Sequence, residues 1–289
     1  MTTTLTAPLA TAAPLTMADL SAKVSGSSFY AGMRILPRPE REAMFAIYGF
    51  CRIVDDIADD QTAPRDRRGA MLDDWARWIG ALYRGGDTGQ AAFLAEAVRR
   101  FDLQEADFQE VIAGMRMDVD ADICWPDFAT LDLYCDRVAS AVGRLSVNVF
   151  GMERAVGVDL AHHLGRALQF TNILRDIDED AGIDRVYLPI EALRLAGITP
   201  TTPAALLGEA GVYTAARWLA AKAQAHFRAA GAILRARPRG HLVAPRLMEA
   251  AYAPVLERMI AAGWHAPRHR IRVSKLALLG MALRLWLFR

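Results

Sequence analysis

Cysteine is scarce in this chain of 289 residues, which contains three, at positions 51, 124 and 135. Three thiols cannot all pair within one chain, and no two of them have CxxC spacing, so a disulfide framework and a zinc module of that type are disfavoured. The six histidines form no HExxH motif. The cysteine usage favours a reducing compartment, and we expect a cytoplasmic protein.

An excess of charge of one sign is also missing. Lys and Arg together number 34 against 33 for Asp and Glu, which leaves a formal net charge of +1. Such a balance gives no general attraction to nucleic acid, and we expect no nucleic-acid partner. Because 53% of the residues are hydrophobic, most of the chain is expected to fold rather than to be disordered.

Long hydrophobic runs are absent as well. No uninterrupted apolar stretch approaches the roughly 20 residues that a spanning helix needs, and the first basic residue is Lys23, so a secretory n-region is missing. Residues 1–17 are expected to form a disordered tail. Residues 276–289 are apolar but interrupted by Arg284, and two interpretations stay open: packing on the domain or fraying, or peripheral contact with the inner face of a membrane. The basic flanks for such contact are Arg268, Arg270, Arg272, Lys275 and Arg289.

Helix-forming sequence fills the remainder. Ala, Leu, Arg and Glu dominate, and Val, Ile and Thr are not gathered into alternating runs. Gly and Pro stand at the expected breaks between segments of helical length. We predict a single all-α domain over residues 18–275, with helices over residues 40–60, 87–101, 104–122, 131–150, 161–178, 203–236 and 245–263.

The first of these helices combines an apolar body with one acidic face. Residues 44–59 read MFAIYGFCRIVDDIAD, which is typical of a helix buried on all sides. Within it, spacings of four, three and four residues place four polar side chains in an arc of roughly 60°. They are Tyr48, Arg52, Asp55 and Asp59.

A second segment has the same design. Residues 168–180 read LQFTNILRDIDED, and spacings of three, four and four residues place its polar set in an arc of roughly 80°. The set is Gln169, Asn172, Asp176 and Asp180.

Buried carboxylates of this kind need a counter-charge. An unpaired ion in a protein interior costs several kcal/mol, and each pair has few basic neighbours on its own face. Mg²⁺ takes oxygen ligands and typically binds one or two carboxylates together with substrate phosphates. We therefore expect the two pairs to face each other across a cavity and to hold Mg²⁺ and a diphosphate. The alternative, that each pair is a solvated acidic face, is common for a lone DxxxD but fits two apolar helices poorly.

Three further features are interpreted more simply. Asp118, Asp120 and Asp122 are spaced by two and spread around a helix, so we interpret them as a solvated helix end. Tyr134 is either a core tyrosine or a site residue, and the residues alone favour the core. The segment between Gly182 and Pro189 lies next to the charged face and would act as a lid that excludes water.

Several of these segments resemble the squalene/phytoene synthase family of head-to-head prenyl transferases. The resemblance lies in SGSSFY at 25–30, YGFCRIVDDIAD at 48–59, YCDRVASAVG at 134–143, QFTNILRDIDED at 169–180 and RVYLP at 185–189. It covers about residues 18–275. Two departures stand out: Ser25 occupies a position where part of the family has histidine, and Arg137 replaces a residue that is uncharged in many relatives.

The resemblance implies an isoprenoid-synthase-type helical bundle around a central apolar cavity. It implies Mg²⁺ as cofactor, held by Asp55, Asp59, Asn172, Asp176 and Asp180. It assigns catalysis to the four aspartates with Tyr134, and contact with the substrate or its diphosphate to Tyr48, Arg52, Gln169, Asn172, Tyr252, Arg270, Ser28 and Phe29.

The implied activity is the condensation of two farnesyl diphosphates to presqualene diphosphate in squalene or hopanoid biosynthesis. Phytoene synthesis from two geranylgeranyl diphosphates and reduction to squalene are the alternatives. The missing strands and GxGxxG motif disfavour a Rossmann nicotinamide site. A non-catalytic family member that acts in assembly is a different class, and the presence of all four aspartates argues against it. A downstream isoprenoid enzyme is the expected protein partner.

Overall fold

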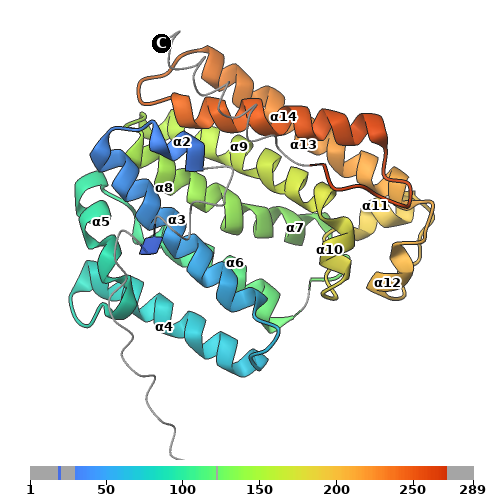
Figure 1. The fold of residues 1–289 in the computed structure, drawn as a ribbon, viewed down its shortest axis with the longest axis horizontal. Coiled ribbons are helices and arrows are strands. Elements are labelled where there is room, and N and C mark those ends of the chain that lie inside the picture. The colour runs from blue at the N-terminus through green and yellow to red at the C-terminus, as the bar shows by residue number, and fades with distance from the viewer. Residues whose placement is uncertain (1–18, 21–29, 122, 272–289) are drawn as a thin grey trace, which may run out of the picture.

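The computed structural model describes residues 19–20, 30–121 and 123–271 (Figure 1). The predicted tail (1–17), the two predicted substrate contacts Ser28 and Phe29, and the predicted C-terminal segment (276–289) lie outside the described residues.

The described part of the chain is helical, and its strand-like pairing is limited to one isolated bridge between Cys124 and Val186. This confirms the predicted all-α class. The helices, with η1 a 3₁₀ helix and η2 a π turn, are α2 (Tyr30–Arg34), α3 (Arg38–Asp59), α4 (Arg65–Arg84), η1 (Gly89–Leu94), α5 (Ala95–Phe101), α6 (Glu105–Asp120), α7 (Phe128–Cys135), η2 (Asp136–Ser140), α8 (Ala141–Val149), α9 (Arg154–Arg175), α10 (Ile177–Ala181), α11 (Ile190–Leu195), α12 (Pro203–Leu206), α13 (Val212–Arg235) and α14 (Val243–Ala262).

Several of the predicted helices are interrupted, and the stretch 87–101 begins with the 3₁₀ helix η1 before α5. The stretch 131–150 contains the π turn η2 between α7 and α8, and the stretch 203–236 breaks before α13. At the second break Gly211 lies so close to Ala196 that an added Cβ would be 2.7 Å from the Ala196 carbonyl oxygen. The predicted helix over 161–178 instead begins at Arg154 and ends at Arg175. The contact of Gly211 with Ala196, which periodicity does not report, accompanies the break before α13.

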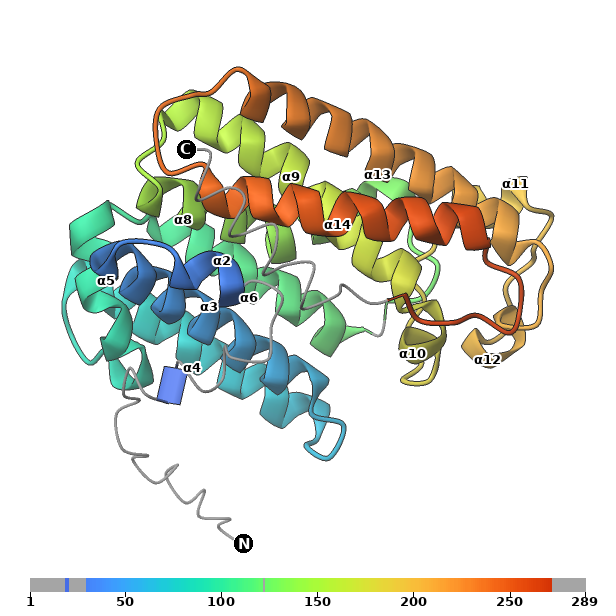
Figure 2. The ribbon, with the colours of Figure 1, turned by 45° about the horizontal axis from the view of Figure 1, so that its top comes forward.

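Helix α9 is central to the bundle. It packs against α13 on one side and against α8 and η2 on the other, while α14 crosses it (Figures 1 and 2). Helices α3, α4 and α6 form the opposite side of the molecule (Figure 1). Phe50 of α3 joins this side together, with its ring edge-on to Trp75 and Phe108 at 5.7 and 5.3 Å between ring centroids.

Glycine permits the close approach of α9 to its neighbours. A Cβ on Gly165 would lie 2.8 Å from the backbone of Ser140, and one on Gly143 would lie 2.9 Å from the Cβ of Ala161. Because residue numbers rise along one helix as they fall along the other, α8 and α9 run antiparallel. This pairing fixes the direction of both helices along the cavity described next.

Candidate active site

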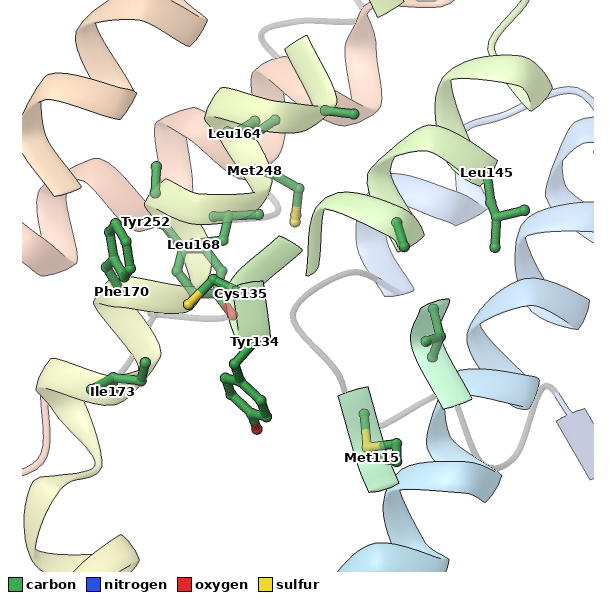
Figure 3. Close-up of a cluster of buried hydrophobic side chains, with 14 of the residues drawn as sticks. Met115, Tyr134, Cys135, Leu145, Leu164, Leu168, Phe170, Ile173, Met248 and Tyr252 are labelled. Atoms are coloured by element: carbon green, nitrogen blue, oxygen red, sulfur yellow. The ribbon is translucent and has the colours of Figure 1, made fainter. Parts of the chain in front are cut away.

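A cavity of about 290 Å³ lies inside the ring formed by α2, α3, α6, η2, α8, α9 and α14. Met115, Leu168 and Met248 come from three of these helices and lie around the same space (Figure 3). Most of the lining is apolar, which suits a hydrocarbon chain, and the volume lies near the lower end of the usual range for ligand sites, roughly 300–1,000 Å³.

The cavity has a polar end and an apolar end. Arg52, Asp55 and Asn172 line one end, where α3 and α9 finish. Leu160 also lines the cavity, and it lies about 18 Å from Asn172 along α9 at 1.5 Å per residue. Phe150, at the end of α8, lies at the same end of the cavity as Leu160, because α8 runs antiparallel to α9. A long apolar ligand with an anionic head therefore fits in one orientation only.

The first predicted acidic face lies on α3 at the polar end. Tyr48, Arg52 and Asp55 line the cavity, while Asp59 follows one turn beyond. Arg52 donates to Asp55 at 2.5 Å and to Asp56 at 3.1 Å. The predicted helical spacing thus places a guanidinium and a carboxylate side by side at the cavity mouth.

The second acidic face does not lie on one continuous helix. Helix α9 ends at Arg175, Asp176 has a φ of −106°, and the short helix α10 carries Asp180. The Asp180 N–H still donates to the Asp176 carbonyl at 2.8 Å, so the spacing of one turn survives the break. The Asp176 carboxylate accepts from Arg175 at 2.6 Å and pairs with Arg270 at 3.0 Å.

One arginine joins the two acidic faces. The Arg185 N–H donates to the Asp180 carbonyl at 2.9 Å, and the Arg185 guanidinium donates to the Asp59 carboxylate at 2.6 Å. The same guanidinium lies 4.0 Å from the Asp118 carboxylate. The structure therefore brings Asp59 and Asp180, which are far apart in the sequence, to the two sides of a single residue. Asp55 and Asp176 thus have basic partners close by in the sequence, Arg52 and Arg175. Asp59 and Asp176 gain further partners from distant segments, Arg185 and Arg270.

Two of the carboxyls hold their protons unusually tightly. Burial, followed by repulsion from Asp59, raises the pKa of Asp55 to about 6. Burial, followed by repulsion from Asp176, raises the pKa of Asp180 to about 7, although Arg185 opposes the shift. The arginines nearby thus leave these acids short of positive charge, and a divalent cation would relieve that deficit.

Asn172 supports the same conclusion independently. Its side-chain oxygen is buried at the cavity mouth and has no hydrogen-bond partner among the described residues. A buried acceptor without a partner is unfavourable by about 1–3 kcal/mol. Amide and carboxylate oxygens are ligands that Mg²⁺ accepts, so this donor set fits the metal that the sequence resemblance implies.

The raised pKa values predict that the metal-free protein loses stability as the pH rises. A carboxyl whose pKa is higher in the folded than in the unfolded chain stabilises the fold below the unfolded value, about 3.9, and that contribution is lost as the pH rises through the folded value. For Asp180 the window runs up to about 7. In EDTA, the melting temperature should fall across this window, and the fall should be shallower in Asp180→Asn. Asp184→Asn, at an exposed position, is the control and should follow the parent protein. Parallel curves for the parent and Asp180→Asn would refute the effect.

Asp118 corrects the sequence interpretation. It was expected at a solvated helix end, but only 2% of it is exposed. Its carboxylate accepts from the Tyr134 hydroxyl at 2.9 Å and from the Tyr187 hydroxyl at 2.8 Å, and the two rings stack at 5.1 Å. Burial and Asp118 raise the pKa of Tyr134 well above its ordinary value. Tyr134 is therefore a buried, hydrogen-bonded phenol, as the core interpretation expected, and it also lies in a network that reaches Asp59 through Arg185.

A periodic signal for Asp118 was available. Val111, Met115 and Asp118 follow the spacing of one helix face, and the first two are buried. The position of Asp118 on the apolar face of α6 indicates burial, whereas its spacing of two residues from Asp120 suggests a solvated cluster. Arg185 and Tyr187 belong to a family segment, but their roles depend on contacts with positions 59 and 118, which the sequence does not reveal.

The other predicted contacts are placed as follows. Gln169 lines the cavity near Asn172, which donates to it at 3.4 Å. Tyr252 is buried on α14, and its hydroxyl helps to raise the pKa of Arg175, against the effect of burial. Arg270 lies outside the cavity lining and donates to Glu179 at 2.8 Å. Arg137 is paired with Glu110 at 2.9 Å.

The segment expected to form a lid is held in place. Val186 donates to Ile123 and accepts from Trp125, both at 2.8 Å, and residues 185–189 are buried. These contacts fix Arg185 between the acidic faces, so residues 185–189 position a charge, and the exposed part of the predicted lid is limited to residues 182–184.

Comparison with known proteins gives the family. A model of the squalene/phytoene synthase family matches residues 22–277. The presqualene diphosphate synthase of Zymomonas mobilis is 57% identical over 270 residues, which cover 92% of either chain. That of Rhodopseudomonas palustris is 54% identical over 258 residues, covering 89% of this chain and 92% of the relative.

A solved structure agrees. Squalene synthase HpnC from Alicyclobacillus acidocaldarius superposes with a TM-score of 0.76 and is 25% identical, over 86% of this chain and 93% of that one. The bundle around the cavity is thus similar to that of an isoprenoid-forming enzyme.

Proposed function

The chain belongs to the squalene/phytoene synthase family, and from that premise we propose that it joins two farnesyl diphosphates head to head to form presqualene diphosphate. It is a prenyl transferase, and squalene or hopanoid biosynthesis is the proposed context. The observation that carries the proposal is the pair of acidic faces, joined by Arg185, at the polar end of an apolar cavity.

We assign a Mg²⁺ site to Asp55, Asp59, Asn172, Asp176 and Asp180. When bound, Mg²⁺ acts as a Lewis acid that neutralises the diphosphate leaving group. The raised pKa of Asp55 and the unpartnered oxygen of Asn172 support this assignment.

The arginines and tyrosines at the mouth are proposed to bind the diphosphates. Arg52 lines the cavity beside Asp55, and its planar guanidinium suits bidentate contact with phosphate oxygens. Tyr48 and Gln169 line the same end. Arg175 and Arg270 both pair with Asp176. We propose that they exchange this partner for the substrate diphosphate when Asp176 binds the cation. Tyr252 is assigned to the same group through Arg175.

The apolar walls are proposed to protect the reaction from water. Loss of diphosphate leaves an allylic cation on the donor chain, and the 2,3 double bond of the acceptor attacks it. Loss of one proton then closes the cyclopropane ring, while the acceptor keeps its diphosphate. Tyr134 does not line the cavity, and it can take this proton only if its own hydroxyl proton moves to Asp118, 2.9 Å away; the released diphosphate is the alternative base.

Product analysis tests the proposal directly. The protein with excess Mg²⁺ should convert farnesyl diphosphate to presqualene diphosphate, identified by mass spectrometry, with no change when a reduced nicotinamide is added. Efficient conversion of geranylgeranyl diphosphate to phytoene would favour the first alternative, and squalene formed with the nicotinamide would favour the second. No product from either substrate would leave the non-catalytic alternative.

The far end of the cavity is expected to decide the chain length. Phe150 is buried there, and its carbonyl accepts from the His241 N–H at 2.8 Å. Phe150→Ala should lengthen the cavity and raise kcat/KM for geranylgeranyl relative to farnesyl diphosphate about tenfold or more. Phe93→Ala removes a ring that packs on Trp75 away from the cavity, and it should lose stability without this change in preference. If the ratio of kcat/KM for geranylgeranyl to farnesyl diphosphate were equal in the two variants, Phe150 would not be the residue that sets chain length.

Membrane contact and a protein partner are further parts of the proposal. Over its described part the chain has no helix of the length and hydropathy that crossing a bilayer requires. Arg268 is engaged with Asp178 at 2.6 Å and Arg270 with Glu179, which removes both from the expected basic flank. Peripheral contact is therefore assigned to the sequence after Arg270. A downstream isoprenoid enzyme would consume the product, which is apolar at one end and anionic at the other.

A further inference from the structure

Three histidines meet on the side of α9 that faces α13. His162 and His163 lie on α9 and His226 on α13, and each offers a ring nitrogen within 4.8 Å of those of the other two. None of the three lines the cavity. The sequence does not reveal this group, because His226 is far from the other two in the chain.

The ring nitrogens are arranged as metal ligands would be. Nδ1 of His163 lies 3.0 Å from Nδ1 of His226, so the two nitrogens share a single proton. Two imidazoles on a tetrahedral Zn²⁺, with Zn–N of about 2.0–2.1 Å, have their nitrogens roughly 3.3 Å apart. A metal ion in place of the shared proton therefore needs only a small movement of the rings.

Two of the three imidazoles, those of His162 and His226, are held neutral, which metal binding requires. Burial, and then the neighbouring His163 and His162, lower the pKa of His226 to about 4. Burial and the adjacent Arg166 lower the pKa of His162 as well. At neutral pH both rings offer a lone pair without first losing a proton.

The surroundings favour a cation. Asp159 lies 3.6 Å from Nε2 of His163, the nitrogen that does not face His226, where a carboxylate orients a ligating ring. Arg166 is the nearby positive charge that opposes a metal, but it is bound by Asp132 at 2.7 Å and by Asp136 at 3.0 Å. Asp136 also accepts from Arg144 at 3.2 Å, so the two carboxylates balance the two arginines that they hold, and Asp159 adds one negative charge beside His163.

We propose that His162, His163 and His226 bind one Zn²⁺ ion, with Asp159 supporting His163 and water as the fourth ligand. Imidazole suits Zn²⁺ among the available cations, whereas the oxygen ligands of the cavity mouth suit Mg²⁺. The ion would cross-link α9 to α13, and α9 carries Gln169 and Asn172 within three turns of His162. The site therefore lies outside the cavity but on the helix that forms one of its walls.

Metal titration tests the site. Protein without a histidine tag is stripped with a chelator and titrated with Zn²⁺ against a chromophoric competitor, in excess Mg²⁺ so that the carboxylates at the cavity mouth are occupied. One equivalent should bind, and His226→Gln should weaken binding at least about tenfold. His241→Gln, which removes a histidine outside the group, should bind as the parent does. Equal affinity in the parent and His226→Gln would overturn the proposal.

A second measurement does not depend on a variant. The His226 ring packs edge-on against Phe170, with 5.8 Å between the ring centroids, so replacing His226 can disturb the fold. Co²⁺ added to the stripped parent protein in excess Mg²⁺ should give the intense visible absorption of a tetrahedral site with nitrogen ligands, and Zn²⁺ should remove it. The melting temperature should rise with Zn²⁺ in the parent and in His241→Gln. Absence of the absorption band would overturn the proposal even if His226→Gln unfolds.

Discussion

Asp55→Asn should lower kcat at least about 100-fold while the fold stays intact. The amide keeps the size of the side chain and its place beside Arg52, but it lacks the charge with which we propose that Asp55 binds Mg²⁺. The pKa of Asp55 is raised to about 6 mainly by burial, so at neutral pH its charge destabilises the metal-free protein. Loss of turnover should therefore accompany an equal or higher melting temperature in EDTA.

Asp56→Asn is the matched control for this prediction. Asp56 is the next residue on α3, it is exposed, and it also pairs with Arg52, at 3.1 Å, but it does not line the cavity. The two variants make the same chemical change one position apart. Turnover should be measured at saturating farnesyl diphosphate over a range of Mg²⁺ concentrations. Near-normal activity in Asp55→Asn, or an equal loss in both variants, would show that the position of the charge is unimportant and would refute the metal assignment.

Asp118→Ala should cause the largest loss of stability among the charge substitutions considered. The carboxylate accepts from both tyrosine hydroxyls and faces Arg185, and all four groups are buried. Removing one member of a buried ion pair leaves the others without a partner and typically destabilises by 3–5 kcal/mol. Arg185 keeps its bond to Asp59, and burial raises the pKa of Asp118, so the lower end, about 3 kcal/mol, is expected.

Urea unfolding followed by circular dichroism measures this effect. Asp120→Ala is the control on the same helix: Asp120 is exposed and lies 3.5 Å from Arg116, a pair expected to contribute less than about 1 kcal/mol. Asp118→Asn keeps an acceptor oxygen, so its free energy of unfolding should lie between those of Asp118→Ala and Asp120→Ala. If Asp118→Ala were no less stable than Asp120→Ala, the buried network would have no part in holding the fold. In Asp118→Ala, activity should also fall, because Arg185 and Tyr134 lose the group that positions them.

Local periodicity determined much of what the sequence revealed. The helical class and the acidic faces follow from spacings within one or two turns, where each residue's direction depends only on its own helix. The segments that resemble the family added three expectations: a central cavity, bound Mg²⁺ and the individual site residues. The family itself is confirmed. The placement of Asp55 beside Arg52 on α3 needed no knowledge of any other segment.

Contacts between distant segments decided the rest. Helix periodicity places Asp118, unlike Asp120, on the buried face of α6, but its partners Tyr134 and Tyr187 lie on other segments and cannot be read from that periodicity. The bond from Arg185 to Asp59 spans 126 residues, and His226 meets His163 across 63 residues. Such contacts arise only when the helices pack, because packing, rather than helical periodicity, fixes which faces meet.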